Sequence, residues 1–433
     1  MSNKLYEETH IQNIANAIRE KTGKTDLLLL SEMADEITNI TGGGSGESYE
    51  YDPNGYLVTV FDYDGTILKE RRLPVGAIFT LPEVPTHERL TFNSWSSTVN
   101  IVDNAITVPD YDVTIGSVYS TVSGASEFDV EITKAYGLTF SFPVTLTGVT
   151  SIDWGDGTTN TDVSHTYADY GKYTIKVYGM THFTRENWDN DGTEIVGVLL
   201  SDSITTIPDN SLFLESLRYL SLPPTLTSIG TWSISSISAL KHITFPNSLT
   251  EINEDSVTDN YALRSVVIPN TVTTIKDGAF ASDWGLKYLC IPESVATIEE
   301  SAFEYCYSLF SNISVRNITA IPNRVFDSCY SIPSLKLGDN ITSIGDNGIN
   351  ACYALKNLKM PSKLTSIGRR GLNYTIGVEV YDFSSCETIP SLYDSYVIPN
   401  DYSMYKILVP VSLYDQWIAT TNWSGYANYI YAV

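Results

Sequence analysis

Five aromatic side chains recur at one spacing in the second half of the chain and could bind a ligand through their rings. They are Tyr261, Trp284, Tyr307, Tyr330 and Tyr353, each 23 residues after the one before. A ring face can stack on a sugar or an aliphatic chain through dispersion and apolar contact. Exposed on five consecutive coils, these rings would form a surface about 20 Å long, from four steps of roughly 4.8 Å. The alternative is that the row only packs neighbouring coils together.

The elements that must position these rings are indicated by an isoleucine nine residues before each of them. Nine such isoleucines recur in steps of 22 or 23 residues. A period of this length predicts a solenoid, in which each short unit buries its apolar face only against its neighbours. The nine are Ile207, Ile229, Ile252, Ile275, Ile298, Ile321, Ile344, Ile367 and Ile389.

Each unit repeats one pattern around its isoleucine. A proline lies six residues before it in five units, and large apolar residues lie five and eleven residues after it. A β-branched run such as residues 265–268 then predicts a brief strand that ends at the next proline. Stacked units therefore predict parallel strands. The pattern, as in LRSVVIPNTVTTIKDGAF, resembles the BspA-like class of leucine-rich repeats over roughly residues 195–400.

The five cysteines all lie in the repeats, and Cys306, Cys329 and Cys352 share one repeat position. A zinc site would need paired short spacings such as C-x-x-C, which the sequence lacks. The odd number of cysteines in separate coils argues against a disulfide framework, so we expect a buried thiol in each coil. The five histidines include no pair at metal-ligand spacing. We therefore expect no metal site and no cofactor.

One segment matches a catalytic motif. Residues 61–67 read FDYDGTI, as in haloacid-dehalogenase-type phosphatases, where the first aspartate (Asp62 here) attacks phosphorus and the second (Asp64) is acid and base. That chemistry needs a parallel sheet before the motif, a helix after it and distal partners. Here another strand-like run follows, and Asp-Gly between alternating strands predicts a hairpin turn. We expect a chain that is not an enzyme.

A second segment, residues 187–192, matches the start of an EF-hand calcium loop. The eighth position should be apolar and is Glu194, and the twelfth should be glutamate and is Val198. An acidic turn is expected, with calcium binding as the alternative. A hydrolase built from scattered carboxylates also stays open as an alternative, because glycosidase acids have no fixed spacing.

The composition favours recognition of a surface over binding of nucleic acid. The net charge is −25, so a polyanion would be repelled. Tyrosine occurs 29 times against 26 lysines and arginines together, and tyrosine-rich surfaces suit recognition. No stretch approaches 18 apolar residues and the start lacks a signal-peptide pattern. We expect no membrane insertion and no export by the usual route.

The part before the repeats divides into a helical start, a linker and two β modules. Residues 1–41 show helical periodicity and resemble the amino-terminal module of tail proteins from phages and prophages of Gram-positive bacteria. Residues 42–48 predict a flexible Gly/Ser linker. Residues 49–122, with the run VTVFDYDGTILKERRLPVGAIF, resemble the Listeria–Bacteroides repeat, a β-grasp-like module. Residues 123–180, which contain DWGDGT and YGKYTIKV, resemble a PKD-type β-sandwich.

The expected fold class is thus multidomain: an N-terminal helical anchor, two small all-β modules and a C-terminal leucine-rich-repeat solenoid. The repeats are expected over residues 181–400, and residues 401–433 are expected to cap the solenoid. In that cap Leu413, Trp417 and Ile418 would form one helical face over the last coil.

The resemblances and the aromatic row together suggest a phage tail, baseplate or fibre protein that binds the host cell surface. Its expected location is the virion tail, after assembly in the host cytoplasm. The expected partners are a host glycan or surface protein and, through residues 1–41, other tail or baseplate proteins. A homo-oligomer, such as a trimer, is also expected. The alternatives are a bacterial BspA-type surface adhesin and a glycan-degrading tail enzyme.

Overall fold

The structure is a computed structural model that describes residues 55–185, 193–399 and 405–433. The expected helical anchor at 1–41 and the linker at 42–48 lie outside the described residues. Within the described residues, regular structure is almost all β, and helices occur only near the C-terminal end. Among the residues that the structure describes, the helices are too short or too polar to span a lipid bilayer.

The first module is a mixed four-stranded sheet. Its central strands, β1 and β6, are parallel, and each has an antiparallel neighbour on its other side. The order is β2 (Ile67–Leu73), β1 (Tyr56–Phe61), β6 (Val113–Thr121) and β4 (Leu90–Ser97). A second pair, β3 (Ile78–Thr80) with β5 (Ala105–Thr107), is antiparallel. Phe79 and Ile106 of that pair are buried with Val58 and Val60 of β1, so the two layers share one core.

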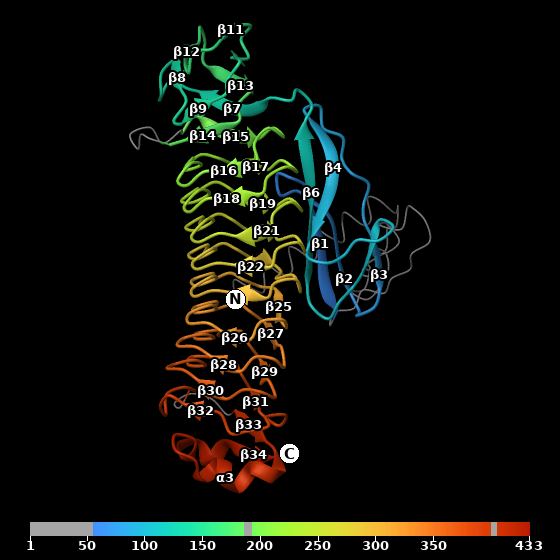
Figure 1. Ribbon diagram of the computed structural model, residues 1–433, viewed down its shortest axis with the longest axis vertical. Helices are drawn as coiled ribbons and strands as arrows, with labels where there is room; N and C mark the ends of the chain where they lie inside the picture. The colour runs from blue at the N-terminus through green and yellow to red at the C-terminus, as the bar shows by residue number, and fades with distance from the viewer. Residues whose placement is uncertain (1–54, 186–192, 400–404) are drawn as a thin grey trace, which may run out of the picture. The chain divides into compact units, whose positions relative to one another are not determined.

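The second module shares its main sheet with the repeats. The six strands of that sheet run in the order β11 (Thr159–Asn160), β10 (Ser151–Asp153), β13 (Gly171–Tyr178), β7 (Ser126–Ile132), β15 (Ile195–Leu199) and β17 (Tyr219–Ser221). Strand β7 pairs antiparallel with β15, which pairs parallel with β17. The module therefore covers the end of the solenoid at which an open strand edge would otherwise be exposed (Figure 1).

Short strands complete the second module. They are β8 (Thr139–Ser141) with β12 (Ser164–Thr166), and β9 (Thr145–Thr147) with β14 (His182–Thr184). Because β14 pairs with β9, the module extends beyond residue 180, where the repeats were expected to begin. Its core and that of the repeats form one cluster of buried side chains. The separate sandwich suggested by the sequence is thus joined to the solenoid through both a sheet and a core.

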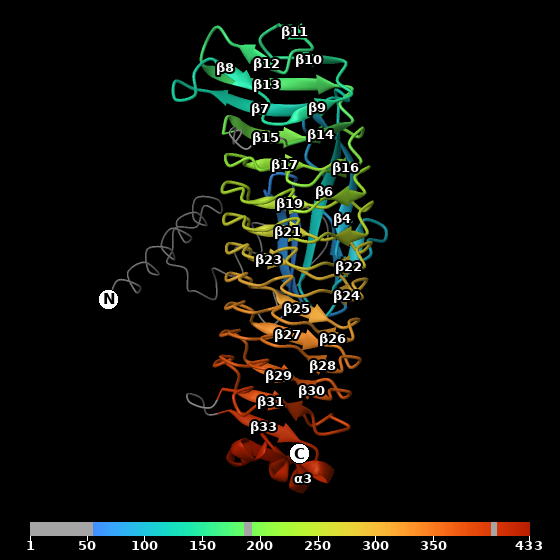
Figure 2. The same cartoon turned by 60° about the vertical axis from the view of Figure 1, so that its left-hand side comes forward.

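The repeats form a β-solenoid of the leucine-rich-repeat type, with two rows of short strands (Figures 1 and 2). After β17 the first row contains β19 (His242–Thr244), β21 (Ser265–Val267), β23 (Tyr288–Leu289), β25 (Asn312–Val315), β27 (Ser334–Leu337), β29 (Asn357–Lys359), β31 (Val380–Asp382), β33 (Lys406–Val409) and β34 (Ile430–Ala432). The strand pairs of this row among the described residues are parallel, as the repeat pattern predicts.

In the second row, each strand ends at the repeat residue whose side chain faces the core. It contains β16 (Thr206–Ile207), β18 (Ser228–Ile229), β20 (Glu251–Ile252), β22 (Thr274–Ile275), β24 (Thr297–Ile298), β26 (Ala320–Ile321), β28 (Ser343–Ile344), β30 (Ser366–Ile367) and β32 (Ser391–Leu392). In the last pair Ile367 lies opposite Leu392, and not Ile389. The ninth isoleucine is therefore not part of the ladder, because the last coil contains extra residues and hydrogen-bond register decides which residue faces inward.

The C-terminal residues close the solenoid with strands as well as helices. Strands β33 and β34 extend the first row, and the helix α3 (Tyr414–Ala419) follows β33. Trp417 is fully buried, and Leu413 and Ile418 pack partly buried against the same core. The predicted helical face therefore covers the last coil, and strands β33 and β34 also contribute to the end of the solenoid.

The first module lies along the first row of strands (Figure 1). The backbone N–H of Asn270 donates to the Ser97 carbonyl at 2.8 Å, and the N–H of Asn312 donates to a carboxylate oxygen of Asp112 at 2.9 Å. A Cβ on Gly116 would lie only 2.1 Å from the Thr244 hydroxyl oxygen, so the two backbones could not approach this closely with a larger residue. Strand β6 thus covers the outward face of β19 and β21, and the module meets the solenoid again at Asn312 of β25.

Candidate aromatic recognition surface

A tight turn in each coil presents the aromatic residue to solvent. The N–H of Leu263 donates to the Asn260 carbonyl at 3.0 Å, and Leu286 makes the same bond to Asp283. The ring-bearing residue is the second residue of this four-residue turn. The first and last residues point into the core, so the side chain between them points outward.

The five predicted residues lie together as one ladder of rings, called the aromatic ladder below. Neighbouring ring centroids are separated by 4.5 Å (Tyr261 and Trp284), 5.6 Å (Trp284 and Tyr307), 4.8 Å (Tyr307 and Tyr330) and 4.8 Å (Tyr330 and Tyr353). The last two pairs are stacked, with interplanar angles of 10° and 18°. Tyr307 is half-buried, and the other four are between 36% and 48% exposed.

The stacking changes how this surface can contact a ligand. Because Tyr330 has a stacked neighbour on each side, both of its faces are occupied by protein and its edge is left for the ligand. No hydrogen-bond partner from the described residues holds the hydroxyls of Tyr307, Tyr330 or Tyr353. Burial, and then the neighbouring Tyr330, raise the pKa of Tyr307 and Tyr353, so these hydroxyls are neutral donors and acceptors near pH 7. At Tyr330 a ligand would meet the ring edge and the hydroxyl, and not the ring face expected from the sequence.

Buried polar side chains support the turn from below. The thiols of Cys306, Cys329 and Cys352 donate to backbone carbonyls of the preceding coil at 3.1–3.3 Å. All five cysteines are free and buried, which confirms the expectation of a structural thiol in each coil. Burial raises the pKa of each thiol, and for Cys386 the value is about 12. Such thiols are protonated and poorly reactive.

One coil carries an acid where its neighbours carry a thiol or an amide. Asp283 is completely buried, and one carboxyl oxygen accepts the N–H of Asn260 at 2.8 Å. The other carboxyl oxygen has no hydrogen-bond partner among the described residues. Burial raises the pKa of Asp283 well above its usual 3.8. The Asp283 carboxyl group is therefore shielded from solvent and helps to hold the turn that carries the ladder.

A family model describes the coils that carry this surface. Residues 190–310 and 283–395 match the BspA type leucine rich repeat region, in 6 copies. The repeats of this chain are BspA-type leucine-rich repeats. This agrees with the resemblance seen in the sequence, and the match does not extend to the two β modules, whose resemblances stay predictions.

The solved structures that are similar to the chain include the following three. A leucine-rich cell surface protein from Faecalibacterium prausnitzii is 18% identical with a TM-score of 0.25, over 52% of this chain and 82% of that one. A leucine-rich repeat protein from Bacteroides ovatus is 15% identical with a TM-score of 0.24, over 76% and 91%. The pneumococcal vaccine antigen PcpA is 12% identical with a TM-score of 0.31, over 83% and 99%. The curated proteins that were searched contain no match.

The expected location in a virion tail is contradicted. The repeats are of BspA type, and one of the similar structures is described as a cell surface protein, whereas none of the three is described as a virion component. The sequence suggested a virion through a short resemblance at residues 1–41, which lie outside the described residues. The homo-oligomer and the attachment through residues 1–41 stay predictions.

The phosphatase-like motif of residues 61–67 forms part of a hairpin between β1 and β2, as predicted. Asp62 is buried and accepts hydrogen bonds from the hydroxyls of Ser117 and Tyr119, both at 2.8 Å. Its second oxygen lies 2.9 Å from the imidazole of His87. Asp64 accepts the N–H of Thr66 within the turn. Both carboxylates thus hold the hairpin and the sheet in place.

The calcium-like loop at residues 187–192 lies outside the described residues, and its departing twelfth position, Val198, is buried in β15. Within residues 55–185, 193–399 and 405–433, no group of three or more histidine, cysteine or acidic side chains could hold a metal ion.

A second row of side chains was missed by the sequence reasoning. It lies twelve residues after the repeat isoleucine and on six consecutive coils contains Lys241, Arg264, Lys287, Phe310, Pro333 and Lys356. Backbone hydrogen bonds join its members, from Arg264 N–H to Lys241, from Lys287 to Arg264 and from Phe310 to Lys287. The signal was a basic residue at this position on three consecutive coils, in a chain of strongly negative net charge.

Proposed function

We propose that this protein is a surface adhesin of BspA type that binds a glycan or a protein on another cell. The observation that carries the proposal is the aromatic ladder, a row of five neighbouring rings. Four of these five side chains are more than one third exposed to solvent. Single exposed apolar residues are ordinary, but a contiguous row of them marks an interaction surface. The ladder also forms an extended surface, because it crosses five consecutive coils.

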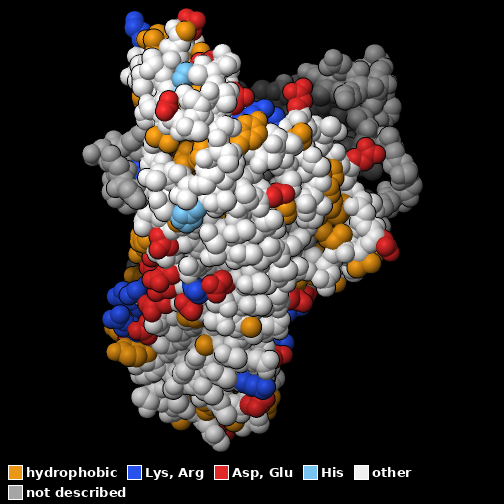
Figure 3. Space-filling view, turned by 45° about the horizontal axis from the view of Figure 1, so that its top comes forward, with side chains coloured by type: hydrophobic (Ala, Val, Ile, Leu, Met, Phe, Trp, Pro, Cys, Tyr) orange, Lys and Arg blue, Asp and Glu red, His pale blue; other side chains and the backbone are white. Residues whose placement is uncertain are grey.

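The chemistry of the ladder supports the same function. On the face of the molecule drawn in Figure 3, acidic and basic side chains gather on one flank and much of the rest is uncharged. A surface of tyrosine hydroxyls and ring edges suits ligands rich in hydroxyl groups, because each contact combines apolar area with a hydrogen bond. Tyrosine also loses little side-chain entropy when it is fixed by a ligand.

The test removes two central rings. The double variant Tyr307→Ala with Tyr330→Ala should lower binding of the fluorescently labelled full chain to target cells at least tenfold. The matched control is Tyr393→Ala with Tyr396→Ala, which removes two tyrosines that are each 65% exposed and lie outside the ladder. Folding of both variants is checked by circular dichroism and thermal unfolding.

A folded ladder variant that binds as well as the unchanged chain would contradict the proposal. An equal loss in the control variant would also contradict it, because binding would then follow the number of exposed tyrosines and not the ladder.

A further inference from the structure

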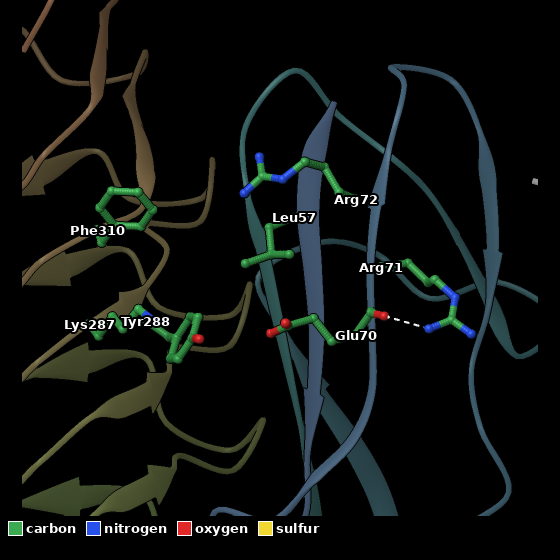
Figure 4. Close-up of a pocket in the computed structure, with 7 residues that line it drawn as sticks. All are labelled: Leu57, Glu70, Arg71, Arg72, Lys287, Tyr288 and Phe310. Atoms are coloured by element: carbon green, nitrogen blue, oxygen red, sulfur yellow. Dashed lines mark hydrogen bonds between the residues drawn. The ribbon is translucent and has the colours of Figure 1, made fainter. Parts of the chain in front are cut away.

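A cleft separates the first module from the coils that its strand β2 faces (Figure 4). It has a volume of about 440 Å³, which is the size of a small-ligand site. One wall comes from the module and the other from the solenoid. The lining residues are Leu57, Glu70, Arg71, Arg72, Lys287, Tyr288 and Phe310.

Three of the four charged residues that line the cleft are basic, in a protein whose net charge is −25. Arg72 extends toward the wall that carries Phe310, whereas the guanidinium of Arg71 points away from it (Figure 4). Arg72 donates one hydrogen bond to the Gly55 carbonyl at 2.7 Å, and a guanidinium has five N–H groups in all. Glu70 is the acid in the lining, and one of its oxygens accepts the hydroxyl of Thr59 at 3.1 Å.

The solenoid wall adds a second cation and an exposed ring. The ammonium of Lys287 lies 4.8 Å from the centroid of its neighbour Tyr288, and no carboxylate of the described residues lies within ion-pair distance of it. Phe310 is 49% exposed and forms no ring pair with another aromatic side chain of the described part of the chain. Unlike Tyr330 of the aromatic ladder, it can offer a face to a ligand.

The positive charge continues beyond the cleft along the second row. Arg264 and Lys241 follow Lys287 on the two preceding coils, at steps of roughly 4.8 Å, and both are exposed. Neither forms an ion pair with a carboxylate of the described residues. A polymer with repeated negative charges could therefore continue from the cleft along the coils, beside the aromatic ladder.

We propose that this cleft binds an anionic sugar of a linear polysaccharide, with its carboxylate or sulfate between Arg72 and Lys287 and its ring against Phe310. The inference rests on the proposed function, because it names the ligand class of the same adhesin. Arginine binds carboxylate and sulfate in a bidentate way, and an aromatic face contacts the apolar side of a sugar ring. A neutral sugar would leave both cations without the group that they recognise.

The experiment compares Lys287→Gln with Lys356→Gln in the full chain. Lys356 is the matched control, because it occupies the same repeat position on a later coil and does not line the cleft. Calorimetry measures the affinity for octasaccharides of hyaluronan and of chondroitin sulfate, for neutral cellohexaose and for a poly-glutamate peptide. Phe310→Ala tests the ring contact separately.

The expected result is about a tenfold weaker affinity of Lys287→Gln for an anionic octasaccharide, which corresponds to one lost charge-assisted hydrogen bond. Lys356→Gln should bind as the unchanged chain does, and Phe310→Ala should weaken the oligosaccharide more than the peptide. Equal losses in the two lysine variants, no loss in either, or absent binding of both anionic octasaccharides would overturn the inference. Peptide binding as tight as that of the anionic sugars would also overturn it.

The two proposals fail separately. If the aromatic-ladder variant loses cell binding while Lys287→Gln binds the anionic sugars unchanged, the cleft assignment is wrong and the adhesin stands. If the ladder variant keeps full cell binding, the proposed function is wrong, whatever the cleft binds in solution.

Discussion

Two ladders of aromatic rings run through the same coils, one inside the solenoid and one on its surface. The inner ladder contains Phe280, Phe303 and Phe326, which are fully buried and stacked at 5.6 and 5.7 Å with interplanar angles of 2° and 5°. On the outside Tyr307, Tyr330 and Tyr353 stack at 4.8 Å with angles of 10° and 18°. The repeat period therefore stacks rings equally well in both places.

The two ladders differ in their exposure to solvent and not in their stacking geometry. Burying a phenylalanine side chain removes its whole apolar area from water, which stabilises the fold by about 1.5–3 kcal/mol. A half-exposed ring keeps much of its hydration, and an aromatic pair adds only about 0.5–1.5 kcal/mol beyond area burial. Regular stacking alone is thus no sign of a structural role. If burial distinguishes the two ladders, substitutions in them should differ in how much stability they cost.

The largest expected effect is on the inner ladder. Phe303→Ala should lower the free energy of unfolding by about 3–5 kcal/mol, because it removes buried area and leaves a cavity between two stacked rings. Urea unfolding followed by circular dichroism measures the change. Phe303→Leu, which fills much of the space, should cost clearly less. If Tyr330→Ala destabilised the protein as much as Phe303→Ala, the contrast between the ladders would be lost.

Asp283 tests the layer between the two ladders. Its pKa is raised in the folded state, so its contribution is fully present below the unfolded pKa near 3.8 and is lost as the pH rises through the folded value. Asp283→Asn keeps the acceptor for Asn260 and avoids a buried charge. We expect it to stabilise the protein more at pH 8 than at pH 4, because only the aspartate can become charged as the pH rises. Melting temperatures at the two pH values give the comparison, and an equal shift at both would refute the assignment.

Removing one outer ring should cost less stability than any inner one. Tyr330→Ala breaks two stacked pairs, each worth about 0.5–1.5 kcal/mol, and exposed sites lie toward the lower end of that range. The same variant should lose much of its binding to cells. Unfolding and binding measured on one preparation separate the two effects. A large loss of stability together with unchanged binding would show that the outer ladder is structural.

The smallest effect is expected at an exposed ion pair on the flank of the coils. Arg324 lies 3.2 Å from Glu300, and both side chains are more than 40% exposed. Arg324→Gln should change the free energy of unfolding by less than about 1 kcal/mol, because solvent screens the pair. Thermal unfolding at low and high salt is the measurement. A loss comparable with that of Tyr330→Ala would mean that surface charge matters as much as the outer ladder.

The repeat architecture was predictable because it is local and periodic. Parallel strands, buried isoleucines and buried thiols all follow from which residues recur at 23-residue spacing, and each coil meets only its neighbours. Prediction failed where the period breaks. At the last coil Leu392 takes the place expected for Ile389, because three more residues precede the strand and only pairing reveals which side chain turns inward.

The β modules show a different limit. The sequence of an edge strand does not indicate which strand it will pair with. Neither segment alone therefore predicted the pairing of β7 with β15 or the hydrogen bond between Asp112 and Asn312. The cleft depends on that docking, because Arg72 and Lys287 belong to different walls. Its basic row was visible in the sequence, but nothing there indicated which basic residue would face the module.

The aromatic row itself was determined by the sequence, since residues at one repeat position must lie one above another in a stacked solenoid. Which part of each ring meets a ligand was decided by the tertiary structure. Side-chain rotation about the turn lets neighbouring rings close to 4.8 Å, and that contact covers their faces and leaves their edges. Spacing along a chain fixes neighbours, whereas packing in three dimensions decides what each neighbour leaves exposed.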